Sequence, residues 1–241
     1  MCLILFAYDQ TDDHSLILIA NRDEFYDRPT TPARYWDDDE RVFAGRDQVG
    51  GGTWLGVTRT GRFAAVTNYR DPSAPNGSRS RGELALDFLT SDEPAAEYLA
   101  QVQRRTDEYS GFNLLVGEFE SAGSALFYLS NRGQGVRQLT TGNYGLSNHL
   151  LDTPWPKIVR GKRSFAELIK DGAAPKEKFF ELLADQTVAD DDRLPSTGVT
   201  LEQERALSPI FIKTPGYGTR CSTFLRFDRK GEWEFEERVF V

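Results

Sequence analysis

The sequence predicts a single α+β domain built on antiparallel sheets. Apolar runs with strand character fill the first third of the chain and return toward its end, and the stretches with helical periodicity are grouped between runs of strands. Helices that do not alternate with strands favour antiparallel packing over a parallel βαβ sheet. A length of 241 residues with 39% hydrophobic residues is enough for one large core. We therefore expect one domain over residues 1–241.

The first third of the chain is expected to form two hairpins. Cys2 to Tyr8 and Leu16 to Asn21 are apolar runs joined by a polar turn, and Thr53 to Thr58 and Arg62 to Tyr69 flank a Thr-Gly turn. Between the hairpins, residues 27–47 are polar and contain two prolines. This composition predicts a long surface loop there.

The rest of the chain contains four helical patterns and six further strand patterns. The helical spacing of apolar residues predicts helices over 82–90, 95–104, 155–170 and 176–185. Strands are predicted over 112–118, 125–130, 135–140, 210–213, 219–228 and 232–240. Residues 187–207 are charged and carry Pro195 and Gly198, which predicts a flexible loop with one turn of helix at most.

Composition excludes several classes of function. A net charge of −8 without a cluster of Lys and Arg argues against nucleic-acid binding. No apolar stretch approaches the roughly 20 residues of a transmembrane helix, and residues 1–8 lack the basic flank of a signal peptide, so we expect no membrane insertion and a cytoplasmic protein. Cys2 and Cys221 make no disulfide framework, and with His14 and His149 as the only imidazoles we expect neither a metal site nor a cofactor.

Cys2 is the candidate nucleophile. It follows Met1 directly and opens the first predicted strand. If Met1 is removed, which the small Cys side chain permits, residue 2 carries both a thiol and a free α-amine. An α-amine has a pKa of roughly 7.7 to 8.0, so it can act as general base for the thiol near neutrality. The alternative is a buried apolar cysteine in a first strand, with Met1 retained.

Several motifs in sequence order resemble one family. They are Asn21-Arg22-Asp23-Glu24-Phe25, Gly50-Gly51-Gly52-Thr53-Trp54-Leu55-Gly56, Thr67-Asn68-Tyr69-Arg70, Ser80-Arg81-Gly82 and Tyr217-Gly218-Thr219-Arg220. Together with Cys2 they span nearly the whole chain and resemble the NRDE family, also called the Transport and Golgi organisation family. The three glycines lack the Lys-Ser/Thr of a phosphate-binding P-loop, so they do not indicate nucleotide binding.

The layout also resembles, more distantly, the N-terminal-nucleophile cysteine hydrolases. That resemblance implies a four-layer αββα sandwich of two antiparallel sheets between helices. It places Arg22 near the thiolate and Asp23 on the α-amine. The hydrolases have two residues between this pair, and adjacent strand residues face opposite sides, so either the backbone bends here or Glu24 or Asn21 takes one of the roles. Without the resemblance, this cluster would be a solvated or structural group of ion pairs.

The same resemblance implies roles for three later residues. Asn68 and Asn148 match positions that supply amide donors to the oxyanion, and Arg220 matches a late arginine that, with Arg22, lowers the pKa of the nucleophile. Each has an ordinary alternative: Asn68 and Asn148 as turn or capping residues, and Arg220 as a surface side chain.

Two functions follow from these residues. The first is hydrolysis of a small-molecule amide or acyl conjugate through Cys2. The second is a carrier protein for haem or lipid on the same fold, in which Cys2 is a ligand or a residue that has lost its catalytic role. A third class, a structural or interaction protein, is supported by no sequence feature beyond the acidic composition. No sequence motif identifies the substrate or the oligomeric state.

Overall fold

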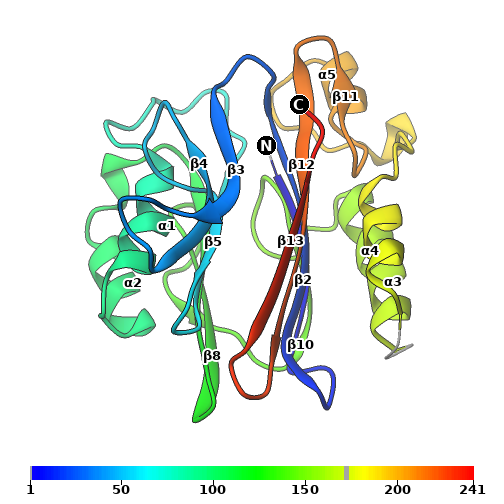
Figure 1. The fold of residues 1–241 in the computed structure, drawn as a ribbon. Coiled ribbons are helices and arrows are strands. Elements are labelled where there is room, and N and C mark those ends of the chain that lie inside the picture. The colour runs from blue at the N-terminus through cyan, green and yellow to red at the C-terminus, as the bar shows by residue number, and fades with distance from the viewer. Residues whose placement is uncertain (1, 171–173) are drawn as a thin grey trace.

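The computed structural model describes residues 2–170 and 174–241. Two antiparallel sheets pack face to face, and helices cover the outer face of each, giving four layers in the order α, β, β, α (Figure 1). Each sheet has two faces to bury, which explains why helices lie outside both. The expected α+β class and the four-layer sandwich are therefore confirmed.

The first sheet contains the N-terminal strand. Its strands are β1 Cys2–Tyr8, β2 His14–Phe25, β10 Gly142–Leu146, β11 Lys213–Thr214, β12 Tyr217–Asp228 and β13 Trp233–Val239. In the described part of the chain their order is β10-β1-β2-β12-β11, and β13 also pairs with β12. Helices α3 Pro156–Lys170 and α4 Lys176–Leu183 pack on its outer face through an apolar cluster around Phe165.

The second sheet has consecutive strands as neighbours. They are β3 Thr30–Tyr35, β4 Val42–Asp47, β5 Leu55–Thr58, β6 Arg62–Asn68, β7 Phe112–Glu120, β8 Gly123–Ser130 and β9 Arg137–Gln138. They follow one another in the order β3 to β9. Helices α1 Arg81–Thr90 and α2 Ala95–Gln103 cover the outer face, where Phe88 and Leu99 meet Leu114.

Strand β1 is buried along its whole length because it is covered on both faces. Ile4 and Phe6 belong to the core between the two sheets, and Leu3 and Leu5 pack against the helix layer. Successive residues of a strand point to opposite faces. Cys2 therefore shares the inter-sheet face with Ile4 and Phe6, at the end of the strand.

The structure corrects the prediction of a surface loop over residues 27–47. This segment forms β3 and β4, and the alternating burial of Val42 and Ala44 fits a strand with one covered face. Pro32 is tolerated because β3 is an edge strand with an irregular register between Thr31 and Arg34. Turn residues in the segment hid this pattern.

Short elements also lie where no regular structure was predicted. Strand β10 pairs with β1, and the 3₁₀ turns are η1 Thr106–Glu108 and η2 Asp191–Arg193. Helix α5 Leu201–Ala206 lies in the predicted 187–207 loop and begins with a capping box between Thr200 and Gln203. Its buried Glu204 bonds Arg70 at 2.8 Å, which ties this segment to the end of β6.

Candidate active site

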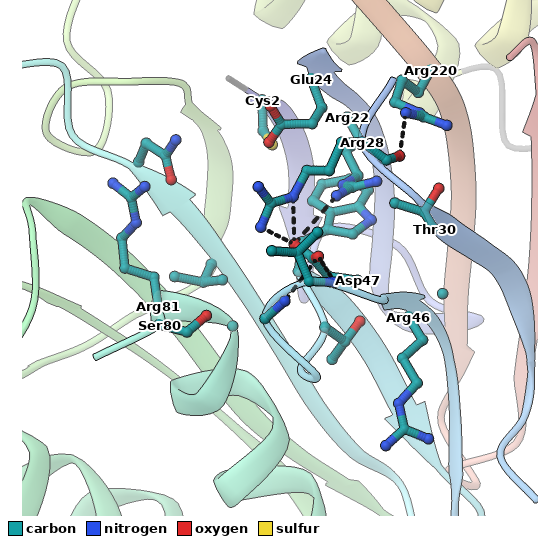
Figure 2. Close-up of a pocket in the computed structure, with 18 of the residues that line it drawn as sticks. Cys2, Arg22, Glu24, Arg28, Thr30, Arg46, Asp47, Ser80, Arg81 and Arg220 are labelled. Atoms are coloured by element: carbon teal, nitrogen blue, oxygen red, sulfur yellow. Dashed lines mark hydrogen bonds and ion pairs between the residues drawn. The ribbon is translucent and has the colours of Figure 1, made fainter. Parts of the chain in front are cut away.

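A cavity of about 630 Å³ lies where the ends of the two sheets meet. Cys2, Arg22 and Cys221 line it from the first sheet, and Asp47 and Asn68 line it from the second. Figure 2 shows Cys2 and Glu24 above Arg22, Arg28 and Asp47 in this cavity. Most of the lining side chains are polar or charged, so the cavity is suited to a polar ligand.

Cys2 is positioned by strand pairing. It lies directly opposite Arg22 on β2, and Arg22 lies opposite Cys221 on β12. The three side chains therefore share the inter-sheet face. The Cys2 residue is 8% exposed, and that exposure is to the cavity it lines.

Burial determines the protonation of the Cys2 thiol. It raises the pKa above the ordinary value, and the Asp23 carboxylate raises it further. The Arg22 guanidinium and a hydrogen bond from the Asp23 backbone act in the opposite direction without overcoming burial. Arg22 thus acts in the direction that the resemblance implies, but burial outweighs it. The thiol is protonated near neutral pH, so attack on a substrate requires a base.

Arg22 and Asp23 face opposite sides of β2. Arg22 points to the cavity, where its Nη2 lies 3.8 Å from Asp47 Oδ2, and Arg28 Nε donates to the same oxygen at 2.9 Å (Figure 2). Asp23 also belongs to the residues that line the cavity, but its Oδ1 accepts from Thr219 Oγ1 at 2.7 Å, and burial raises its pKa. Asp47 thus holds both arginines at the cavity wall.

The other candidates of the Asn-Arg-Asp-Glu motif have separate places. Asn21 donates to the Leu183 and Ile210 carbonyls at 2.9 Å each and accepts from Ser222 Oγ at 2.6 Å, so it anchors the helix side of the sheet. Glu24 lines the cavity. Of the two alternatives raised for the motif, only Glu24 reaches the cavity.

The two asparagines are differently placed. Asn68 lines the cavity, and its side-chain amide makes no hydrogen bond to the described residues, so it can donate to a ligand. Asn148 is fully buried outside the lining, and its Nδ2 donates to the Asn68 carbonyl at 3.0 Å. The structure therefore brings Asn68 to the cavity with Cys2 and places Asn148 behind it.

Arg220 is the extra residue of a β-bulge between Thr219 and Cys221. Its Nη1 donates to the carbonyls of Phe25, Tyr26 and Arg28 at 2.7, 3.0 and 2.6 Å. These bonds hold the turn after β2 in shape. Arg220 lines the cavity, but it is not one of the main groups that shift the pKa of Cys2.

Residues 1–241 match the Transport and Golgi organisation 2 family. The chain belongs to this family. The Transport and Golgi organization protein 2 homolog of Homo sapiens is 37% identical over 258 residues, covering 100% of this chain and 94% of that protein. The Transport and Golgi organization protein 2 of Drosophila melanogaster is 28% identical over 265 residues, covering 100% of this chain and 93% of that protein.

The fold of this chain is similar to that of a solved hydrolase structure. The C2A mutant of the conjugated bile acid hydrolase from Clostridium perfringens superposes with a TM-score of 0.52 at 8% identity, covering 99% of this chain and 92% of that chain. At this identity the likeness establishes the fold alone. This chain therefore shares the fold of that hydrolase, in agreement with the sandwich of two antiparallel sheets between helices that the sequence resemblance implied.

Sequence reasoning missed three charged residues near Cys2. Arg81 belongs to the Ser-Arg-Gly motif without a role of its own, Asp47 lies in the segment predicted as a loop, and Lys157 follows a Trp-Pro pair that carries no functional pattern. Lys157 is buried in α3, its Nζ donates to the Leu207 carbonyl at 3.1 Å, and burial lowers its pKa to about 8. The sequence signal that could have identified Lys157 is the helical periodicity of residues 155–170, which places this lysine on the buried face of the helix.

The two histidines lie outside the cavity lining. His149 Nε2 contacts Tyr69 Oη at 2.7 Å and its Nδ1 contacts Thr153 Oγ1 at 2.8 Å, and His14 begins β2 at the opposite end from Arg22. Within residues 2–170 and 174–241, no group of three His, Cys, Asp or Glu could hold a metal ion. Among the same residues, no helix has the length and apolar character needed to cross a bilayer.

Proposed function

We propose that this protein is a hydrolase that cleaves an amide or acyl conjugate of small size, with Cys2 as the nucleophile. The observation that carries the proposal is the position of Cys2 at the start of β1, in a cavity with Asn68, whose side-chain amide has no hydrogen-bond partner among the described residues. The fold shared with a conjugated bile acid hydrolase supports it. A carrier role for haem or lipid has less support, because the histidines lie outside the lining and the lining is charged.

The proposed reaction has two steps. A base takes the Cys2 proton, and the sulfur attacks the carbonyl carbon of the substrate. The charge that forms on the carbonyl oxygen is stabilised by Asn68, an interaction worth about 3 kcal/mol per donor in other enzymes. The carbon–nitrogen bond then breaks, the amine leaves with a proton, and water hydrolyses the thioester to an acid and the free thiol.

The base in this proposal is the α-amine of Cys2 after removal of Met1. Met1 lies outside the described residues, so this part remains a prediction. Asp23 would orient the amine, and the arginines Arg22 and Arg220 and the amide of Asn148 would support the site indirectly. Burial of the Cys2 side chain favours the neutral thiol, and a protonated thiol is a poor nucleophile, so a base beside the sulfur would assist the attack.

The test uses a chain with an N-terminal tag whose removal by a site-specific protease leaves Cys2 as the first residue. We expect a panel of acyl amides to yield free amine after tag removal and none before it. Cys2→Ala should abolish the activity with folding intact. Cys221→Ala, which removes the neighbouring thiol, is the matched control and should retain it. Equal turnover by the tagged chain or by Cys2→Ala would refute the mechanism.

A further inference from the structure

We propose that the ligands of the Cys2 cavity carry an anionic group, a carboxylate or a phosphate, and that Arg81 binds it. This inference rests on the proposed function for its placement of the reacting bond. The evidence for an anion site is independent of the proposed reaction, because it comes from which charged residues of the cavity wall are already paired with other residues of the protein.

The cavity is rich in arginine although the chain is acidic. In the described part of the chain six arginines line it, namely Arg22, Arg28, Arg46, Arg79, Arg81 and Arg220, against four carboxylate side chains. The whole chain has a net charge of −8. Cations gathered in one cavity of an acidic protein favour an anionic ligand.

Five of these arginines already have partners within the protein: either a carboxylate pairs with the guanidinium charge, or backbone carbonyls accept hydrogen bonds from its N–H groups. Arg22 and Arg28 share Asp47, and Arg220 donates to backbone carbonyls. Arg46 pairs with Asp38 at 2.8 Å. Arg79 pairs with Glu83 and with Glu108 at 2.9 and 3.2 Å. These five arginines are therefore held in place by the protein itself.

Arg81 is different. Its one hydrogen bond to the described residues runs from Nη1 to the Gly111 carbonyl at 3.1 Å, and none of those residues places a carboxylate within 4.0 Å of it. A guanidinium has five N–H donors, so most of its hydrogen-bonding capacity is unused. Burial lowers the pKa of Arg81, and the nearby Cys2 and Glu24 are the groups that oppose this effect. A partly desolvated cation that has no carboxylate in direct ion-pair contact gains from an anionic ligand.

The surroundings of Arg81 extend the same site. Ser80 precedes α1 and lines the cavity, and its side chain makes no capping hydrogen bond. A Cβ built at Gly50 would come within 2.8 Å of Ser80 Oγ, so glycine keeps the space beside that hydroxyl open. Figure 2 shows Ser80 and Arg81 across the cavity from Arg28 and Asp47. The start of a helix adds a favourable electrostatic field for an anion.

The substrate class that follows is an acyl amide with an acidic substituent, because Arg81 and Cys2 face the same cavity. The anion would be fixed by Arg81 and Ser80 on one wall, with the amide carbonyl left between Cys2 and Asn68. A carboxylate and a phosphate offer the same acceptor chemistry to a guanidinium. The experiment therefore includes both.

The test measures binding to Cys2→Ala protein by isothermal titration calorimetry, so that no turnover is needed. The probes are two matched pairs: N-hexanoylglycine with N-hexanoylglycinamide, and N-hexanoyl-O-phosphoethanolamine with N-hexanoylethanolamine. We expect at least one anionic probe to bind at least about tenfold more tightly than its neutral partner. The pair that shows the larger preference identifies the anion.

The preference should disappear in Arg81→Gln and persist partly in Arg81→Lys, which keeps the charge. Arg46→Gln removes a cavity arginine that is already paired, so it is the matched control and should retain the preference. If Arg81→Gln does not fold, the preference in folded Cys2→Ala protein must still weaken with added sodium chloride.

Equal binding of charged and neutral probes, absence of binding by both anionic probes, or an unchanged preference in folded Arg81→Gln would overturn the inference. Hydrolysis of neutral amides through Cys2 would remain possible in each case. Conversely, an anion preference that depends on Arg81 would stand even if no substrate is ever hydrolysed.

Discussion

Arg22 and Asp23 are adjacent in sequence, yet their side chains lie on opposite faces of β2. Arg22 lies between the sheets beside Cys2 and Asp47, and Asp23 bonds Thr219 on the helix side. The β-bulge at Arg220 on the neighbouring strand shifts the register between the pairings of these two residues. One short motif thus supplies a cation to the cavity and a buried carboxylate to the layer behind it.

The reactivity of Cys2 should follow its raised pKa. We expect alkylation by iodoacetamide to be slow at pH 7 and to accelerate as the pH rises through 9 and beyond, because only the thiolate reacts. Cys221 should label more slowly at every pH, since burial and Glu237 raise its pKa well above the ordinary value. Peptide mass spectrometry at a series of pH values measures both rates.

Arg22→Gln provides the control, because Arg22 acts to lower the pKa of Cys2. Its loss should shift the labelling profile of Cys2 to still higher pH. Rapid labelling of Cys2 at pH 6 to 7 in the wild-type protein would contradict the raised pKa and would restore the sequence-based expectation of a reactive thiolate.

Much of the fold could be predicted from sequence because its strands and helices have strong periodic patterns. The first predicted strand, Cys2 to Tyr8, has the bounds of β1, and the helix predicted over 82–90 is α1 Arg81–Thr90. Strands β3 and β10 were missed because an edge strand with Pro32 and a short glycine-containing strand show no clear alternation.

The site was predicted less completely, since residue identity does not reveal which groups are already bonded. The resemblance gave Asn68 and Asn148 the same role. Only the three-dimensional contacts show that the Asn148 amide is engaged, whereas the Asn68 amide makes no hydrogen bond to the described residues. The burial of Cys2 likewise depends on packing from distant strands. Its effect on the pKa exceeds that of the arginine beside it, which the sequence alone does not reveal.

Asn68 and Asn148 should respond differently to substitution. Asn68→Ala removes a donor that faces the cavity, so we expect kcat for an identified substrate to fall about 10²-fold with little change in stability. Asn148→Ala removes the buried donor to the Asn68 carbonyl, so we expect a loss of about 1–3 kcal/mol in the free energy of unfolding. Steady-state kinetics and urea denaturation of both variants separate the two effects. A stable Asn148→Ala with wild-type unfolding would contradict the assignment.

Arg220 should contribute mainly to stability. Arg220→Ala leaves the carbonyls of Phe25, Tyr26 and Arg28 without their donor, and we expect the free energy of unfolding to fall by about 3 kcal/mol or more. Arg226 lies on the same strand in an exposed ion pair with Glu234 at 2.7 Å. Arg226→Ala is therefore the matched control, with an expected loss below about 1 kcal/mol. Equal losses in the two variants would show that the bonds of Arg220 are not needed for the fold.

Lys157 should make stability depend on pH in the alkaline range. Burial lowers its pKa to about 8, whereas in the unfolded chain the pKa is near its ordinary value of 10.5. As the pH falls from 10.5 to 8, the unfolded chain binds a proton that the folded protein does not. The contribution of Lys157 to the free energy of unfolding therefore declines across this window, by about 3 kcal/mol in total, and is constant below it.

The measurement compares wild type with Lys157→Met in urea denaturation at pH 8 and at pH 10.5. The free energy of unfolding of wild type, relative to the variant, should be higher at pH 10.5, because the unfolded chain has then lost about half of its proton on Lys157, whereas at pH 8 it holds that proton almost fully. Lys162 lies on the same helix with its ammonium partly exposed and paired with Asp152 at 2.6 Å, so Lys162→Met is the control. If the difference in free energy of unfolding between wild type and Lys157→Met is the same at both pH values, burial does not shift the protonation of Lys157. An equally large change with pH for Lys162→Met would lead to the same conclusion.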